Sequence, residues 1–309
     1  MDTEGNLYAT GNGQVWRRSA KTHEMKRIAG VPNSADNPFS DADNQPATKT
    51  RMTEIGQMAF DRQGNLYLPE QRGRIRKLSG DHLEIIAGTG VDGSQGDMGP
   101  ARAAWQHRPK AVAFDALGNL VVADTESHFL RVIAARNGLI FRIAGNGAME
   151  SNGDGQPSLS AAIGKPMALA FDAAGNLYFA DATGHAIRQI SKATGHLSTI
   201  AGQLGRKGFA GDGGPANRAR LYYPDAIAFD RHGDLYIADC NNNRIRKVDM
   251  RTGIIVTVAG NGKSGDAGAG DGGDARDASI GSPTGVAVDE AGNLYIAANS
   301  AVREVTADR

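Results

Sequence analysis

The chain has 309 residues, of which 40% are hydrophobic, only 6% are aromatic and 41 are glycine. This glycine-rich composition with short apolar runs favours an all-β fold. The 34 basic residues balance 34 acidic ones, so the net charge is zero and does not favour binding to nucleic acid. The single cysteine, Cys240, excludes an intrachain disulfide and a cysteine-clustered zinc site.

The N-terminal stretch MDTEGNLYATG has neither a basic n-region nor an apolar h-region, so we expect no signal peptide in it. No apolar run reaches the length of a membrane span, and no membrane insertion is expected. The stretch starts part-way through a repeat. If an export signal lies upstream of it, an extracytoplasmic or secreted location is favoured.

The motif GNLY, or a close variant, occurs six times, and successive copies are 59, 54, 57, 58 and 59 residues apart. The glycines that open the copies are Gly5, Gly64, Gly118, Gly175, Gly233 and Gly292. The fuller copies read as four short strands: an alternation ending in Asp, as in AVAFD (111–115), then a GNLY strand, an arginine-containing strand such as RIRKV (244–248), and a strand ending in IAG or VAG. Four antiparallel strands repeated at a constant period predict the blade of a β-propeller.

We therefore predict an all-β fold, a six-bladed β-propeller of four-stranded antiparallel blades, as a single domain over 1–309. The terminal blades are predicted to be incomplete, because a first strand before Asp2 and a fourth strand after 301–306 are missing. Alternation within the first strand places Phe114 and Ala111 on opposite faces, so large side chains of one blade can pack against small ones of the next. The blades are expected at about 1–30, 55–88, 109–145, 166–202, 224–260 and 283–309, joined by long loops.

These units resemble the repeat of the NHL-repeat family, roughly P-x-G-[VI]-A-[VF]-D, G-N-L-Y-[VI]-A-D and N-x-R-[IV]-R, and the resemblance covers the whole chain. The loop GDGGPA (211–216) has near copies at 96–101, 153–157 and 270–275. It is similar to the linker of bacterial NHL-repeat proteins and of the teneurin propeller. Related six-bladed propellers, the amidating-lyase, strictosidine synthase-like and gluconolactonase families, imply that this fold can also host metal-dependent or lyase chemistry.

A feature present in most blades is expected to serve the fold, whereas a specific site should differ between blades. We interpret the repeated loop as scaffolding, in which glycines supply positive φ and Pro100 and Pro215 are the first residues of short helical turns. A calcium loop is disfavoured because each copy offers only one or two carboxylates, and a Walker loop is excluded because no GK[ST] follows. The loop aspartates, which we expect to bond to loop amides, are Asp97, Asp154, Asp212 and Asp271.

Acidic residues end the second strand in four blades, at Glu70, Asp124, Asp181 and Asp239. In three of these blades an arginine follows seven residues later, which favours an ion pair within the blade. These arginines are Arg131, Arg188 and Arg246. The alternative is that the four carboxylates hold a cation on the axis, calcium or zinc. Gly11 and Ala298 supply no ligand in the terminal blades, and His107 is the one histidine placed near the pore mouth, so no metal is firmly predicted.

The segments that lead into the first strands differ from blade to blade, as in QHRPKA (106–111) and LYYPDA (221–226). We predict that they line the pore mouth and bind a ligand through their polar and aromatic side chains. The candidate residues are Glu54, His107, Arg108, Lys110, Lys165, Tyr222, Tyr223 and Asp225.

The favoured function is that of a bacterial, monomeric, non-catalytic propeller that binds a protein, peptide or glycan through its loop-rich face. The alternative is a metal-dependent hydrolase or lyase, lactonase-like or amidating-lyase-like, with a cation in the central pore. Nucleic acid is not expected as a partner because the charge is balanced. No catalytic residue is identified, since the serines near histidines lack the sequence context that exposes a nucleophile.

Overall fold

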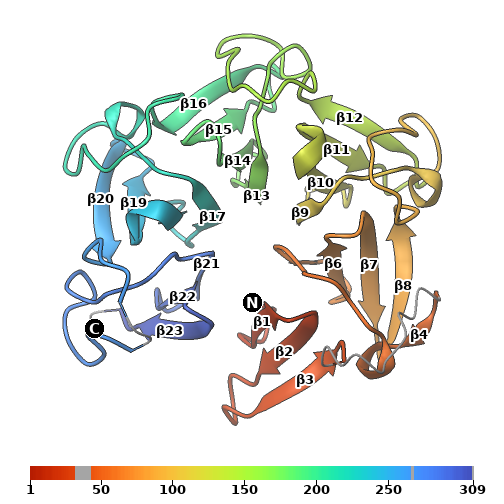
Figure 1. Ribbon diagram of the computed structural model, residues 1–309, viewed down its shortest axis with the longest axis horizontal. Coiled ribbons are helices and arrows are strands. Elements are labelled where there is room, and N and C mark those ends of the chain that lie inside the picture. Colours follow the sequence, from red (N-terminus) through yellow and green to blue (C-terminus); the bar gives the residue numbers. More distant parts are fainter. Residues whose placement is uncertain (32–42, 266–267, 308–309) are drawn as a thin grey trace. The chain divides into compact units, whose positions relative to one another are not determined.

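The structure, a computed structural model, describes residues 1–31, 43–265 and 268–307 (Figure 1). It divides into two compact units, Met1–Ile143 and Ala144–Arg309, and each is described by itself. The chain forms a six-bladed β-propeller, with mainly four-stranded antiparallel blades and three-stranded terminal blades. The predicted fold class is therefore confirmed, whereas the single domain over 1–309 stays a prediction.

Unit 1 contains the first three blades. Blade 1 has three strands, β1 (Leu7–Gly11), β2 (Gln14–Arg18) and β3 (Met25–Ala29). Blade 2 has the order β4-β8-β7-β6-β5, with β4 (Gln45–Pro46), β5 (Ala59–Phe60), β6 (Leu66–Glu70), β7 (Arg74–Ser79) and β8 (His82–Ala87). Blade 3 consists of β9 (Pro109–Phe114), β10 (Leu120–Asp124), β11 (Phe129–Ile133) and β12 (Ile140–Ala144). The short β4 is an additional edge strand that the repeat did not predict.

Unit 2 contains the last three blades. Blade 4 consists of β13 (Pro166–Phe171), β14 (Leu177–Asp181), β15 (Ala186–Ile190) and β16 (Leu197–Gly202). Blade 5 consists of β17 (Pro224–Phe229), β18 (Leu235–Asp239), β19 (Arg244–Asp249) and β20 (Ile254–Ala259). Blade 6 has three strands, β21 (Gly285–Val288), β22 (Leu294–Ala298) and β23 (Ala301–Val305).

The described helical segments are single 3-10 turns in the loops. They are η1 (Ala47–Lys49), η2 (Ala101–Ala103), η3 (Thr125–Ser127), η4 (Ala216–Arg218) and η5 (Cys240–Asn242). Pro100 and Pro215 are the N-cap residues of η2 and η4, with extended ψ values of 130° and 129°. The prediction that these prolines occupy the first helical position is therefore wrong by one residue. The backbone becomes helical only at the alanine that follows each proline.

A repeated aspartate closes the turn between the first and second strands of a blade. In blade 3, Asp115 Oδ1 accepts hydrogen bonds from the amides of Leu117 (2.8 Å) and Asn119 (2.9 Å), and Oδ2 accepts one from Asn119 Nδ2 (2.8 Å). Gly118 lies between them with φ +82°, a conformation that favours glycine. This is why the aspartate and the GN dipeptide recur together in the repeat.

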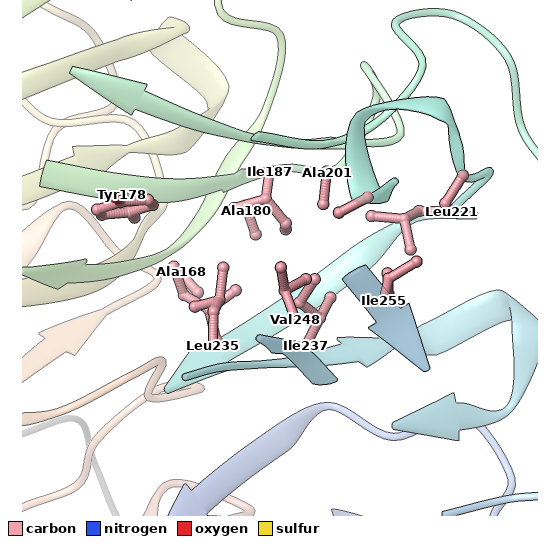
Figure 2. Packing of buried hydrophobic residues seen from close by; sticks show 13 residues of the cluster. Ala168, Tyr178, Ala180, Ile187, Ala201, Leu221, Leu235, Ile237, Val248 and Ile255 are labelled. Atoms are coloured by element: carbon pink, nitrogen blue, oxygen red, sulfur yellow. The ribbon is translucent and has the colours of Figure 1, made fainter. Parts of the chain in front are cut away.

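Small and large side chains alternate where neighbouring blades pack together. Figure 2 shows this between blades 4 and 5, where Ala168 and Ala180 lie near Leu235 and Ile237 in one buried cluster. Aromatic pairs add to this packing, because the tyrosine of a GNLY strand meets the phenylalanine of the next blade edge to face. The ring centroids are 4.8 Å apart for Tyr8–Phe60 and Tyr67–Phe114, and 5.0 Å apart for Tyr178–Phe229.

Candidate binding surface

In each of blades 2 to 5, the segment before the first strand bonds to the turn between the second and third strands. In blade 3, His107 N donates to Asp124 Oδ1 (2.6 Å) and His107 O accepts from Glu126 N (3.1 Å). In blade 5, Tyr222 N donates to Asp239 Oδ1 (2.7 Å) and Tyr222 O accepts from Asn241 N (3.0 Å). In each of these blades the segment before the first strand and the turn between the second and third strands therefore lie together, and we call the surface that they form the loop-rich face.

The carboxylates that end the second strands are buried and paired with arginines. Asp124, Asp181 and Asp239 are fully buried, and each has an oxygen 3.3–3.4 Å from the guanidinium of the arginine seven residues later. The predicted ion pairs within these blades are confirmed. Blade 2 has an unpredicted counterpart, in which Glu70 Oε2 lies 2.7 Å from Arg76 Nε.

The loop aspartates also bond to these arginines, so the expectation that they bond to loop amides is wrong. Asp97, from the loop before blade 3, accepts hydrogen bonds from Arg131 Nε (3.0 Å) and NH2 (2.7 Å). Asp154 accepts from Arg188, and Asp212 accepts from Arg246. Asp271 pairs with Arg303 in blade 6. An ion pair therefore links each repeated loop to an arginine of the blade that follows it.

Backbone carbonyls complete the partners of each buried guanidinium. Arg131 donates to the carbonyl oxygens of Trp105 (2.6 Å) and Gln95 (3.1 Å), both in the loop that carries Asp97. A buried charge that is paired and hydrogen-bonded on several sides fixes one geometry of the surrounding backbone. These contacts support the interpretation of the recurrent loop as scaffolding, with an arginine rather than loop amides as the partner of its aspartate.

Two carboxylates share one guanidinium in blades 3 to 5, and this arrangement perturbs their proton affinity. Burial raises the pKa of Asp124 to about 7, although the His107 amide and Arg131 act in the opposite direction. Burial raises the pKa of Asp181 and of Asp239 to about 6. With both carboxylates ionised, each cluster has one excess negative charge, and a bound proton neutralises it.

The metal candidates Glu70, Asp124, Asp181 and Asp239 are the same carboxylates. Within the described ranges, the structure contains no group of three or more His, Cys, Asp or Glu side chains placed to hold a metal ion. A cation at these carboxylates would compete with a guanidinium for the same oxygens. The calcium or zinc site, for which these carboxylates were the candidates, stays the alternative to the predicted ion pairs.

The predicted ligand-binding residues of unit 1 lie along blades 2 and 3. Glu54 and Lys110 come together, with 2.6 Å between Oε1 and Nζ. His107 Nε2 lies 4.0 Å from Asp92 Oδ2, in the neighbouring loop. Arg108 is exposed and has a left-handed backbone, with φ +52°.

The predicted residues of unit 2 lie along blades 4 and 5. The ring of Tyr222 packs edge to face against His185, with centroids 5.5 Å apart, and the amide of Tyr223 donates to His185 Nδ1 (3.3 Å). Tyr223 also has a left-handed backbone, with φ +56°. Lys165 and Asp225 are partly buried, and the Lys165 amide donates to Thr183 Oγ1 (3.0 Å).

Two cation–π pairs of blade 5, Lys207 with Tyr222 and Arg244 with Phe209, are together called the aromatic–cationic cluster, because one loop carries both Lys207 and Phe209. Lys207 Nζ lies 5.2 Å from the centroid of the Tyr222 ring, and the Arg244 guanidinium carbon lies 3.7 Å from that of the Phe209 ring. Phe209 is 42% exposed, although it is a large apolar side chain. Phe209 was not among the predicted binding residues because it adjoins the repeated GDGGPA loop, which was interpreted as scaffolding. The loops before blades 3 and 4 have Ser94 and Ser151 at this place, so the sequence does distinguish Phe209.

The loop that carries Lys207 and Phe209 is held in place by hydrogen bonds of Gly208, which lies between them. Gly208 N donates to Leu221 O (3.1 Å), and Gly208 O accepts from Asn242 Nδ2 (2.8 Å). Arg244 donates to the carbonyl oxygens of Asn242 (2.8 Å) and Asn261 (2.9 Å). The cluster is therefore presented by bonded backbone rather than by an unsupported loop.

The fold and this surface define a β-propeller with a loop-rich face. A family model described as the teneurin NHL domain matches residues 205–267. NHL repeat-containing protein 2 from Bos taurus is 24% identical over 93% of this chain, and this chain spans only 42% of that relative. The six repeats, the fold and these matches show that the chain belongs to the NHL-repeat propeller family.

Solved structures share the fold at low identity. A chain in a nidogen/laminin complex has a TM-score of 0.63 at 14% identity, over 97% of this chain and 89% of that one. A virginiamycin B lyase from Staphylococcus aureus has a TM-score of 0.55 at 15% identity, over 99% of this chain and 78% of that one. Among the residues placed by the structure, no helix is long and apolar enough to cross a membrane.

Proposed function

We propose that the chain is a non-catalytic binding propeller whose loop-rich face binds an extended segment of a partner protein. The observation that carries this proposal is the aromatic–cationic cluster. Tyrosine and arginine are enriched among the residues that contribute most to binding at protein interfaces, and Phe209 adds exposed apolar area beside them. The partner segment would carry aromatic and acidic side chains, because the cluster supplies two cations, Lys207 and Arg244.

The fold alone does not choose between binding and catalysis. A chain of this fold occurs in the nidogen/laminin complex, a complex between proteins, and another is a lyase. A metal-dependent hydrolase or lyase is less well supported here, because the carboxylates that would hold the cation lie against buried arginines. A neutral glycan would also use aromatic rings, but it gives no role to the cations.

A displayed random peptide library selected against the chain tests this proposal. We expect enriched peptides with acidic and aromatic residues, and a loss of affinity of about tenfold to a hundredfold in the variant K207E/F209A. Isothermal titration calorimetry with the synthesised peptides measures this loss. The matched control is L117A, because Leu117 is also an exposed large apolar residue, 82% exposed, but lies in a turn between first and second strands.

Selection of no peptide above the background of an unrelated propeller would argue against the proposal. Equal affinities for the wild type and K207E/F209A would place the binding elsewhere. Binding to a glycan array without binding to any peptide would replace the protein partner with a glycan. Thermal unfolding of both variants checks that each one remains folded.

A further inference from the structure

A second surface feature lies in unit 1, well separated in sequence from the aromatic–cationic cluster. It is a hollow of about 480 Å³ lined by Asn12, Gly13, Arg51, Met52, Thr53, Glu54 and Arg72. We infer that this hollow, called here the blade 1–2 pocket, binds a small molecule through a carboxylate or phosphate group. The inference is independent of the proposed protein partner.

Three segments of two blades form the walls of the blade 1–2 pocket. Asn12 and Gly13 form the turn between β1 and β2, residues 51–54 lead into blade 2, and Arg72 lies in the turn between β6 and β7. Gly13 has φ +71°, and a Cβ atom at this position would collide with the carbonyl oxygen of Met52. Close approach of the two backbones therefore sets the shape of the pocket.

The charges that line the pocket favour an anion. Arg51 and Arg72 bring two guanidinium groups from different segments. Both also interact elsewhere in the chain, but a guanidinium has five N–H donors and can bind more than one group. The single carboxylate in the lining, that of Glu54, lies 2.6 Å from Lys110 Nζ, so it does not cancel the charge of the arginines. The planar fork of N–H donors in a guanidinium matches the geometry of carboxylate and phosphate groups.

Thr53 supplies a hydroxyl group that lacks a partner. Its Oγ1 is buried and makes no hydrogen bond in the described part of the chain, although its amide donates to Glu70 Oε1 (3.4 Å). Buried polar atoms in proteins nearly always have a partner, protein or otherwise. An anionic oxygen in the pocket would accept a hydrogen bond from this hydroxyl group.

The buried ion pair behind Thr53 differs from those of the later blades. Arg76 is almost fully buried, and Glu70 is its one carboxylate partner among residues 1–31, 43–265 and 268–307. In blades 3 to 5, two carboxylates face each guanidinium. The pair in blade 2 is electrically balanced, so it opposes an anion less than the clusters of the other blades do.

Three sugars of similar size separate the anionic group from the rest of the ligand. Isothermal titration calorimetry with glucuronate and with glucose 6-phosphate should show binding of at least one of them, while neutral glucose should not bind. The double variant R51Q/R72Q should weaken that binding by about tenfold or more, and T53V by severalfold, because both remove donors to the anion. The control variant R136Q/R251Q removes two exposed arginines outside the pocket and should leave the affinity unchanged.

Binding of neither anion, or equal binding of the wild type and R51Q/R72Q, would overturn the inference. Equal binding of glucose would show recognition of the sugar ring rather than of the anion. If R51Q/R72Q unfolds at the assay temperature, R72Q alone decides, because Arg72 is an exposed turn residue and its replacement should leave the fold intact. Failure of this experiment leaves the peptide result untouched, because the two sites share no residue.

Discussion

Replacing Arg131 with methionine is expected to lower the free energy of unfolding by about 3–5 kcal/mol. The guanidinium is fully buried and pairs with Asp97 and Asp124, and methionine leaves both carboxylates without their cation. The same change removes the hydrogen bonds to the carbonyl oxygens of Trp105 and Gln95, so the loop before blade 3 is no longer bonded to Arg131. Urea denaturation of the wild type and R131M, followed by circular dichroism, measures the difference.

Two controls distinguish the loss of the buried ion pairs of Arg131 from the loss of an ordinary exposed ion pair. R276Q breaks an exposed pair with Asp274 and should leave the free energy of unfolding almost unchanged. The triple variant D97N/D124N/R131M removes the carboxylate charges together with the cation, and it should recover part of the stability lost in R131M. A decrease of less than about 1 kcal/mol in the free energy of unfolding of R131M would contradict the role of Arg131 in holding this loop.

The same cluster should make stability depend on pH. The pKa of Asp124 is raised from 3.8 to about 7 in the folded protein, so between about pH 4 and pH 7 the folded chain holds a proton that the unfolded chain releases. The stabilisation from this proton is complete below about pH 4 and is lost as the pH rises through 7. The variant D124N is neutral at every pH and should remove this part of the slope, an effect on the order of a few kcal/mol across the window.

Urea denaturation at several pH values in this window, for the wild type and D124N, measures the two slopes. D277N is the matched control, because Asp277 is exposed. Parallel slopes for the wild type and D124N would show that Asp124 does not titrate in this range. A wild type that gains stability relative to D124N as the pH rises would show a lowered pKa for Asp124.

Most of the fold was predictable because its determinants are local and repeated. The aspartate of each first-to-second turn lies four residues before its partner, which is an asparagine except in blade 5, where it is Asp234. The strands alternate with period two. The ion pair of Asp124 with Arg131 spans seven residues across one hairpin, which its spacing also indicates. These features recur in several blades, so the sequence shows them more than once.

The partners of the loop aspartates were not predictable in the same way. Asp97 and Arg131 are 34 residues apart, and no local pattern tells an arginine partner from a loop amide. The interval of 34 recurs for Asp154 with Arg188 and for Asp212 with Arg246, so the signal was present in the repeat as a second constant spacing.

The candidate sites depended on differences between blades, and these are harder to interpret. Tyr222 was identified as one such difference, and the structure adds Lys207 over its ring and a second cation–π pair, Arg244 with Phe209. Arg51 and Arg72 were missed because only the tertiary structure brings the segments of the blade 1–2 pocket together. Single residues that differ from the repeat carry little information until their neighbours are known.

The central claim is that the carboxylates at the ends of the second strands serve the fold and that binding occurs elsewhere on the loop-rich face. A crystal structure grown with calcium and zinc chloride, with anomalous diffraction data for both metals, tests it most directly. The claim predicts that guanidinium groups contact Asp124, Asp181 and Asp239, as Arg131, Arg188 and Arg246 do here. A metal ion bound by these carboxylates, with the arginines displaced, would contradict it.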